Sequence, residues 1–325
     1  MWFALVLFVS LTASSATTSF AIDEFAEGSA SRESHKIYGN MAAAFTPVNK
    51  DFELDFTNVP KMAMRLKEWG IPNVMLGGTT GESVSFSTEE RVAEVKAWMP
   101  IADRLGLNVY VHVGENAQYE ARELAARVSK MGIKGFLSMG PTYFKPSTAD
   151  ELVDTIALIA SGAPDLPFWY YHFPANTGLT VNMLDFIRAA DSSGKIPNLM
   201  GIKYTDEHIM EFNEIGNLKN KKYNMLMGRD EILTSALTTG VCDGGVGSTL
   251  NFISYNVPLR DLYMRGDAKS REIANQHELQ TIAVIQAWKD ICGSLNPQKA
   301  ILKMTGIDFG PLRLPQANLS HDMEM

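Results

Sequence analysis

Eight short apolar stretches, each followed by a segment of helical character, recur between Gly39 and Val246 and constrain the fold of this chain most strongly. The stretches span residues 39–45, 73–76, 107–113, 135–139, 167–171, 199–203, 223–227 and 242–246. Strands that are apolar along their whole length are typical of a parallel sheet covered on both faces. Eight repeats with short connections therefore predict an α/β fold, a (β/α)8 TIM barrel, rather than an open doubly wound sheet.

Helical segments complete this repeat and continue beyond it. Between the strands, helices are predicted over residues 59–69, from 88 onward, and over 117–131, 147–160, 180–190, 206–218 and 230–239. The strands and helices of the barrel thus occupy residues 37–251. Further on, apolar residues at helical spacing predict helices over 255–265, 268–291 and 297–304. We expect residues 252–315 to form the eighth helix and a C-terminal helical extension, with a polar tail at 316–325.

The N-terminus differs from the rest of the chain. Residues 1–10 are almost wholly apolar, a Ser/Thr/Ala-rich stretch follows, and Ser19-Phe20-Ala21 offers a small-x-small cleavage site. This pattern predicts a secretory signal peptide at residues 1–21 and a polar linker at 22–36, which would place the protein in a lumenal or extracellular compartment. An unprocessed tail is the alternative, because no lysine or arginine precedes Arg32. The apolar stretch is too short for a stable membrane-spanning helix.

Charge and composition narrow the range of partners and cofactors. The chain carries 29 Lys and Arg against 37 Asp and Glu, a net charge of -8, and has no basic stripe. Neither nucleic acid nor a membrane surface is therefore expected as a partner. Two cysteines are too few for a disulfide scaffold, and the six histidines lack metal-binding spacing, so no metal site is predicted. The glycine-rich segment 77–82 lacks the lysine of a phosphate-binding loop, and no cofactor is predicted.

One lysine ends the sixth apolar stretch. Residues 198–202 lead directly into Lys203, and Thr205 and Asp206 then begin the next helical segment. In a (β/α)8 barrel, the carboxyl ends of the strands form the catalytic face. A buried lysine at this face can act as a nucleophile towards carbonyl compounds. On this stretch alone, a solvated surface lysine is the commoner alternative.

Further polar motifs follow the ends of other strands. They are Gly78-Thr79-Thr80-Gly81-Glu82, Tyr171-x-x-Pro174, Gly201-Ile202-Lys203-x-Thr205, Gly228-x-Asp230-Glu231 and Gly244-Gly245-Val246-Gly247-Ser248-Thr249-x-Asn251. Together and in this order, the motifs resemble the class I pyruvate aldolase family that includes N-acetylneuraminate lyase and dihydrodipicolinate synthase. The resemblance covers nearly the whole chain from about residue 38 to Pro315. Segments 143–146 and 310–315 are similar to the lyases of this family.

The resemblance implies a lyase that cleaves N-acetylneuraminate, a sialic acid, to pyruvate and N-acetylmannosamine. Lys203 matches the lysine that forms a Schiff base with the C2 keto group, and Tyr171 matches the general acid/base. Thr79 and Thr80 match the residues that hold the substrate carboxylate. Tyr143 matches an aromatic residue that neighbouring subunits present towards each other's site, and the family expectation is a homotetramer.

The sugar tail is implied to bind at a second group of residues. These are Gly228, Asp230, Glu231, Gly247 and Ser248, with Thr205 beside the imine. Asp230 and Glu231 also begin the seventh helix, where carboxylates stabilise the helix dipole, so a structural role is the alternative. Asn176 occupies the position at which synthases of the family usually carry an arginine. Another pyruvate-dependent aldolase or synthase, and a sialic-acid-binding protein without catalysis, remain the alternative functions.

Overall fold

The computed structural model describes residues 32–292 and 295–316, and the unit that begins at Ile37 contains a closed barrel. Its strands are parallel and pair in chain order, with the last strand closing on the first. They are β1 (Met41–Ala43), β2 (Asn73–Leu76), β3 (Asn108–His112), β4 (Gly135–Ser138), β5 (Phe168–His172), β6 (Leu199–Tyr204), β7 (Asn224–Met227) and β8 (Cys242–Gly247). Each strand overlaps its predicted stretch, and the predicted (β/α)8 fold is confirmed.

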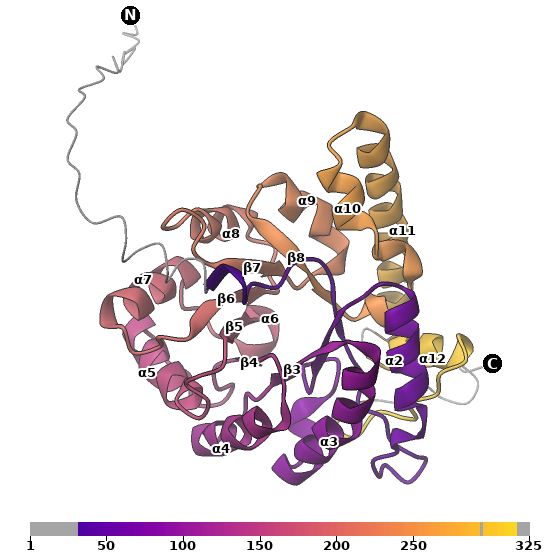
Figure 1. The fold of residues 1–325 in the computed structure, drawn as a ribbon, viewed down its shortest axis with the longest axis horizontal. Helices are drawn as coiled ribbons and strands as arrows, with labels where there is room; N and C mark the ends of the chain where they lie inside the picture. The colour runs from indigo at the N-terminus through magenta and orange to yellow at the C-terminus, as the bar shows by residue number, and fades with distance from the viewer. Residues whose placement is uncertain (1–31, 293–294, 317–325) are drawn as a thin grey trace, which may run out of the picture. The chain divides into compact units, whose positions relative to one another are not determined.

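Helices alternate with the strands and surround the barrel (Figure 1). They are α2 (Val59–Glu68), α3 (Thr88–Leu105), α4 (Gln118–Val128), α5 (Ala149–Ala160), α6 (Pro174–Thr177), α7 (Met183–Ser193), α8 (Ile209–Gly216) and α9 (Leu233–Thr238). The sequence did not predict α6, a single turn between Pro174 and the left-handed Gly178, because one turn is too short to show helical periodicity. Helix α8 begins three residues later than predicted, after a bend in which the Asp206 carboxylate accepts the N–H of Glu207.

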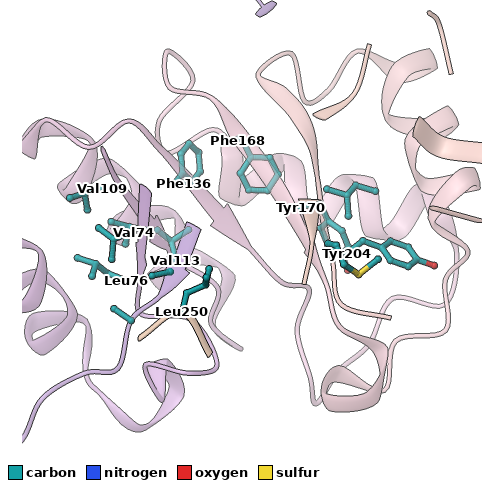
Figure 2. Packing of buried hydrophobic residues seen from close by; sticks show 14 of the residues in the cluster. Val74, Leu76, Val109, Val113, Phe136, Phe168, Tyr170, Tyr204 and Leu250 are labelled. Atoms are coloured by element: carbon teal, nitrogen blue, oxygen red, sulfur yellow. The ribbon is translucent and has the colours of Figure 1, made fainter. Parts of the chain in front are cut away.

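Side chains on the strands alternate between two buried layers, because successive residues of a strand point to opposite faces. Met75 and Tyr171 belong to the cluster that fills the barrel interior. Val74 and Tyr170, each one position earlier, belong to the larger cluster between the barrel and its helices (Figure 2). A strand residue at the catalytic end therefore points either into the barrel or towards a helix, and only the first group can meet a ligand.

The C-terminal helical extension is also present. Helices α10 (Leu259–Met264) and α11 (Ala268–Cys292) pack against each other and against α9, and α12 (Asn296–Met304) follows. The chain then returns to the loop after β1, where the N–H of Val48 donates to the carbonyl of Phe309 at 3.0 Å. This return brings the end of the chain next to the catalytic face.

Some predictions fall on parts of the chain that the structure does not describe. The signal peptide at 1–21, the linker up to residue 31 and the tail from 317 lie outside the described residues and stay predictions. Among the residues that are described, no helix combines the length and the apolar character needed to cross a membrane.

Candidate active site

Strand register brings Lys203 and Tyr171 together. The two residues are direct partners in the β5–β6 pairing, so their side chains leave neighbouring strands on the same face of the sheet. The Nζ atom of Lys203 lies 3.8 Å from the centroid of the Tyr171 ring, and both residues are buried. A primary amine held at the interior of a barrel, against an aromatic ring, is shielded from bulk water on that side. This confirms that Lys203 is not a solvated surface lysine.

The turn after β2 supplies a hydroxyl to the same place. Thr79 Oγ1 lies 3.1 Å from the hydroxyl oxygen of Tyr171, within hydrogen-bonding distance. The turn itself is closed by hydrogen bonds from Glu82 N to the Thr79 carbonyl and from Ser83 N to the Gly78 carbonyl. An amine, a phenol and a threonine hydroxyl, which come from separate segments of the sequence, therefore meet at the catalytic end of the barrel.

A cavity of about 370 Å³ opens above these groups. The predicted site residues that line it are Thr79, Thr80, Tyr171, Lys203, Thr205, Gly228, Asp230, Glu231 and Ser248. Tyr143 and Gly247 are not among the described residues that line it. The structure therefore gathers most of the predicted residues around one space large enough for a small organic ligand.

Asp230 lies on the wall of this cavity and is held by Thr249. One carboxylate oxygen accepts the backbone N–H of Thr249 at 3.0 Å and its hydroxyl at 2.6 Å. Burial raises the pKa of Asp230 to about 6. A Cβ atom at Gly247 would come within 1.6 Å of the other oxygen, so Gly247 leaves room for this carboxylate instead of lining the cavity. The sequence motif did not distinguish these two roles.

Glu231 is surrounded by positive charge. Its Oε1 atom lies 3.2 Å from Nη1 of Arg229 and 3.6 Å from Nζ of Lys289, which comes from α11. Arg229 also approaches Glu207 at 3.3 Å. Both cationic residues line the cavity, and the sequence motif Gly228-x-Asp230-Glu231 gave no indication of either. Arg229, Glu231 and Lys289 thus form a part of the cavity wall, here called the outer wall, in which opposite charges compensate one another. These charged groups can contact polar groups of a ligand.

Thr205 and Gly228 fit against each other. A Cβ atom at Gly228 would lie 1.9 Å from Thr205 Oγ1, so only glycine leaves space for the threonine hydroxyl. Thr205 is buried and its hydroxyl has no hydrogen-bond partner within the part of the chain that the structure describes. Because an unsatisfied buried hydroxyl is costly, this group is a candidate contact for a bound ligand.

Tyr143 lies apart from the cavity of its own chain. It follows β4 and is 77% exposed, beside Phe144, which is 84% exposed. The two rings contact each other edge to face with centroids 4.8 Å apart. Two large aromatic side chains exposed side by side are unusual on the surface of a monomer and are typical of a surface that another protein chain covers.

His112, at the end of β3, is a site residue that sequence reasoning missed. Its Nε2 atom accepts the N–H of Met139 at 3.3 Å, so Nδ1 carries the proton and donates to the carbonyl of Gly77 at 2.8 Å. Burial lowers the pKa of His112 to about 3, which keeps the ring neutral. The ring packs edge to face on Tyr171, with centroids 5.6 Å apart. His112 thus fixes the acid/base candidate and the start of the β2 turn, and a lone histidine in the sequence carries no signal for this.

Within the described ranges, no group of three or more His, Cys, Asp or Glu side chains is arranged to hold a metal ion. The groups that line the cavity include an amine, a phenol, hydroxyls and carboxylates. A buried lysine beside a tyrosine, on neighbouring strands of a (β/α)8 barrel, is the arrangement expected of enzymes that bind carbonyl compounds as Schiff bases.

Comparison with known proteins specifies this class further. Residues 36–325 match the dihydrodipicolinate synthetase family. The N-acetylneuraminate lyases of Pongo abelii and Homo sapiens are each 31% identical over 291 residues, covering 88% of this chain and 89% of theirs. The structure of Proteus mirabilis N-acetylneuraminate lyase superposes with a TM-score of 0.82 at 30% identity, covering 89% of this chain and 95% of that one. The chain belongs to the dihydrodipicolinate synthetase family.

Proposed function

We propose that this protein is a class I aldolase that cleaves N-acetylneuraminate to pyruvate and N-acetylmannosamine. The observation that carries the proposal is the buried Lys203 amine against Tyr171, whose hydroxyl contacts Thr79, at the base of a cavity. The similarity to lyases with this name supports the choice of substrate.

The reaction follows from the groups at the base of the cavity. The Lys203 amine attacks the C2 keto carbon of the open-chain sugar acid, and loss of water gives an iminium ion. Tyr171 takes the proton of the C4 hydroxyl, the C3–C4 bond breaks, and its electrons pass into the iminium to form an enamine. N-acetylmannosamine leaves, C3 of the enamine is protonated, and water hydrolyses the imine to release pyruvate and the free amine.

The substrate carboxylate is assigned to the β2 turn. Thr79 and Thr80 both line the cavity, Thr79 contacts the Tyr171 hydroxyl, and threonine hydroxyls and backbone amides can donate to an anion. A carboxylate held there lies next to the tyrosine and can pass protons with it. This supports the assignment of Tyr171 as acid/base.

The sugar tail is assigned to a second group of residues that line the cavity. Asp230, Glu231, Ser248 and Thr205 present carboxylates and hydroxyls to the cavity, and paired carboxylates accept hydroxyl protons well. Gly228 contributes by making space for Thr205, and Gly247 makes space for Asp230.

We also propose that the protein acts as a homotetramer, in which Tyr143 of one subunit reaches the site of its neighbour. The exposure of Tyr143 and Phe144 supports this assignment. Measurement of mass in solution by light scattering tests it. A Tyr143→Phe variant that remained tetrameric with unchanged turnover would remove Tyr143 from the catalytic residues.

Asn176 weighs against one alternative, in which an aldehyde acid is the partner in the same chemistry. Its side chain lines the cavity at the position where synthases of the family usually carry an arginine, and it is neutral. An uncharged amide suits a polar sugar better than an aldehyde acid, which needs a cation for its second carboxylate.

The decisive experiment is reduction with borohydride in the presence of pyruvate, followed by mass spectrometry of the protein. We expect one adduct per chain, located on Lys203, and none in Lys203→Ala. Turnover of N-acetylneuraminate, assayed in parallel, separates the lyase from other pyruvate-dependent aldolases. An adduct without turnover would retain the Schiff-base chemistry and reject the substrate, whereas no adduct would reject the enzymatic proposal.

A further inference from the structure

The turn that carries Thr79 and Thr80 is held from outside the cavity. The carbonyl of Gly81 accepts the hydroxyl of Thr46 at 2.7 Å. The carboxylate of Glu82 pairs with Nζ of Lys299 at 3.0 Å and accepts the backbone N–H of Arg313 at 2.8 Å. Glu82 has a left-handed backbone with φ of 53°, a conformation that costs free energy for a residue with a side chain. These contacts therefore maintain a turn that would not keep this shape alone.

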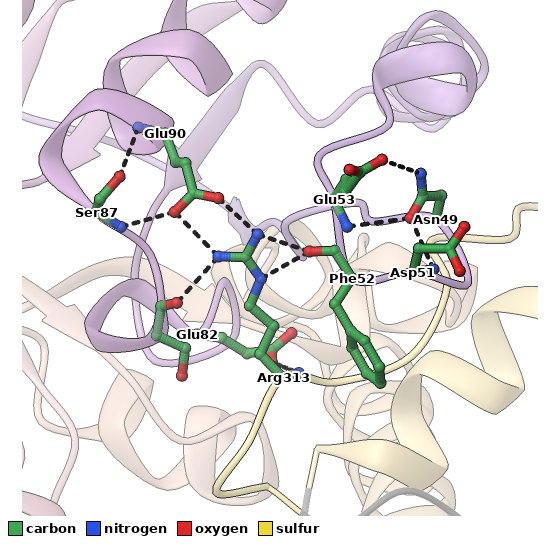
Figure 3. Close-up of polar contacts among 9 residues, drawn as sticks. Asn49, Asp51, Phe52, Glu53, Glu82, Ser87, Glu90 and Arg313 are labelled. Carbon is green, nitrogen blue, oxygen red and sulfur yellow. Dashed lines mark hydrogen bonds and ion pairs between the residues drawn. The ribbon is translucent and has the colours of Figure 1, made fainter.

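Two residues of the C-terminal segment, Lys299 and Arg313, bind groups from the first third of the chain. Lys299 also donates to the carbonyls of Thr46 and Pro311, at 3.0 and 2.9 Å. The guanidinium of Arg313 binds both oxygens of Glu90 and the carbonyl of Phe52 (Figure 3). It also donates to the carbonyl of Ser85. The C-terminal segment thus connects the loop after β1 with the turn after β2 through hydrogen bonds and an ion pair.

The hydrogen bonds of Thr46 constrain the protonation state of a further group, Glu94. The Thr46 hydroxyl has one proton, and its oxygen lies 2.7 Å from the Gly81 carbonyl oxygen, which can only accept. Glu94 Oε1 lies 3.0 Å from the same hydroxyl oxygen. The single Thr46 proton cannot serve two acceptors fully, whereas a neutral Glu94 acid can supply the proton of the second hydrogen bond itself.

The surroundings of Glu94 agree with a neutral acid. Glu94 is buried on α3, and within residues 32–292 and 295–316 no Lys, Arg or His nitrogen lies within 4.0 Å of its carboxyl oxygens. Arg91 on the same helix is directed to the carbonyls of His112 and Gly114, Lys299 of α12 is paired with Glu82, and Glu82 repels a second negative charge. Burial, the largest cause, raises the pKa of Glu94 to about 8.

We propose that Glu94 is a positioning residue for the reaction: as a neutral acid it donates to Thr46, and Thr46 in turn holds Gly81 and the turn that receives the substrate carboxylate. Ionised Glu94 would need the Thr46 proton for itself, and the Gly81 carbonyl would lose its partner. Recognition of the keto acid should therefore weaken as pH rises through the titration of Glu94. This inference rests on the proposed function for the identity of the ligand.

The test compares the wild-type protein with Glu94→Gln from pH 6.5 to 9.5. A glutamine amide donates to Thr46 at every pH in this range. We measure the pyruvate concentration that gives half-maximal borohydride trapping at Lys203. Between the lowest and the highest pH, we expect this concentration to rise roughly three- to tenfold more in the wild type than in Glu94→Gln, because the loss of one hydrogen bond has about this effect. Thr46→Val should show the weakened trapping already at neutral pH, and Thr46→Ser should restore the wild-type profile. Thermal melting at each pH verifies that each variant is folded.

A second measurement does not depend on activity. Hydrogen–deuterium exchange of the amides of residues 78–82 should accelerate at high pH in the wild type relative to Glu94→Gln at the same pH. If the wild-type protein forms no adduct, the proposed function fails, and the exchange data still decide the role of Glu94. Identical pH profiles for wild type and Glu94→Gln in trapping and in exchange would overturn the inference.

Discussion

The two ends of the cavity, for which we propose binding of the keto acid and of the sugar tail, are built in different ways. At the keto-acid end, Lys203 and Tyr171 are fixed by strand register, and the turn with Thr79 is anchored by buried contacts to the C-terminal segment. At the sugar end, Asp230 and Glu231 lie on a short 3₁₀ turn (Asp230–Ile232) after β7. Charged side chains from loops and from α11 approach Glu231 there.

This difference indicates which residues can be replaced without loss of the chemistry. Displacing a strand or the anchored turn moves several reacting groups at once, because they share backbone and buried hydrogen bonds. Replacing a side chain at the outer wall changes one contact to a substrate. We therefore expect mutations at the keto-acid end to lower kcat, and mutations at the sugar end to act mainly on KM.

The largest expected effect comes from removal of the hydroxyl of Tyr171. Tyr171→Phe keeps the ring against Lys203 but removes the hydroxyl that we propose takes the C4 hydroxyl proton. We expect kcat for N-acetylneuraminate to fall by about 10²- to 10⁴-fold, the range for loss of a general acid/base. Steady-state kinetics measure this directly.

Tyr170→Phe is the matched control for that variant. Tyr170 is the preceding residue of the same strand, but its ring packs on Phe186 of α7, outside the barrel. We expect near wild-type kcat. A Tyr171→Phe variant with more than a tenth of wild-type kcat would show that another group transfers the proton, and the contrast between the two ends would lose its main support.

The sequence was sufficient for the barrel and for the groups at strand ends. Short apolar stretches have the period of buried strands, and a lysine or tyrosine at the end of such a stretch can be placed at the catalytic face without knowledge of contacts. The position of Lys203 at a strand end was found in this way. Its catalytic role and that of Tyr171 were implied by the family resemblance, which depends on five motifs spread over the chain.

The groups that sequence reasoning missed depend on contacts between distant segments. Glu82 and Lys299 are separated by more than 200 residues, yet their side chains pair at 3.0 Å. Lys289 approaches Glu231 from a helix that has no motif. Gly247 belongs to a recognisable motif, but only the position of the Asp230 carboxylate shows that the glycine provides space. Such roles arise from packing, which residue patterns do not encode locally.

A smaller effect is expected from the titration of Asp230 at the sugar end. Its pKa of about 6 means that the carboxylate is ionised above this pH and protonated below it. Because only the ionised form accepts two hydroxyl protons, KM for N-acetylneuraminate should rise roughly tenfold as pH falls from 7 to 5. Pyruvate trapping should lack this change, since pyruvate has no sugar tail.

Asp230→Asn provides the comparison for this pH dependence. An asparagine accepts the Thr249 hydrogen bonds through its carbonyl oxygen but does not titrate. We expect a raised KM at pH 7 and little further rise towards pH 5. An equal rise in KM with falling pH in this variant and in the wild type would assign the titration to another group.

The smallest effect is expected at the outer wall, from Lys289→Met. Lys289 is 54% exposed in its side chain and lies 3.6 Å from Glu231, which retains Arg229 as a partner at 3.2 Å. An exposed ion pair contributes about 0–1 kcal/mol, so KM should change by at most about fivefold, with kcat unchanged. The effect should shrink in about 1 M salt, where exposed charges are screened within roughly 3 Å. Lys303→Met, which removes a similarly exposed lysine paired with Asp308 away from the cavity, should leave KM unchanged. A fall in kcat for Lys289→Met would mean that charge at the outer wall affects bond cleavage, and the two ends could then no longer be treated as independent.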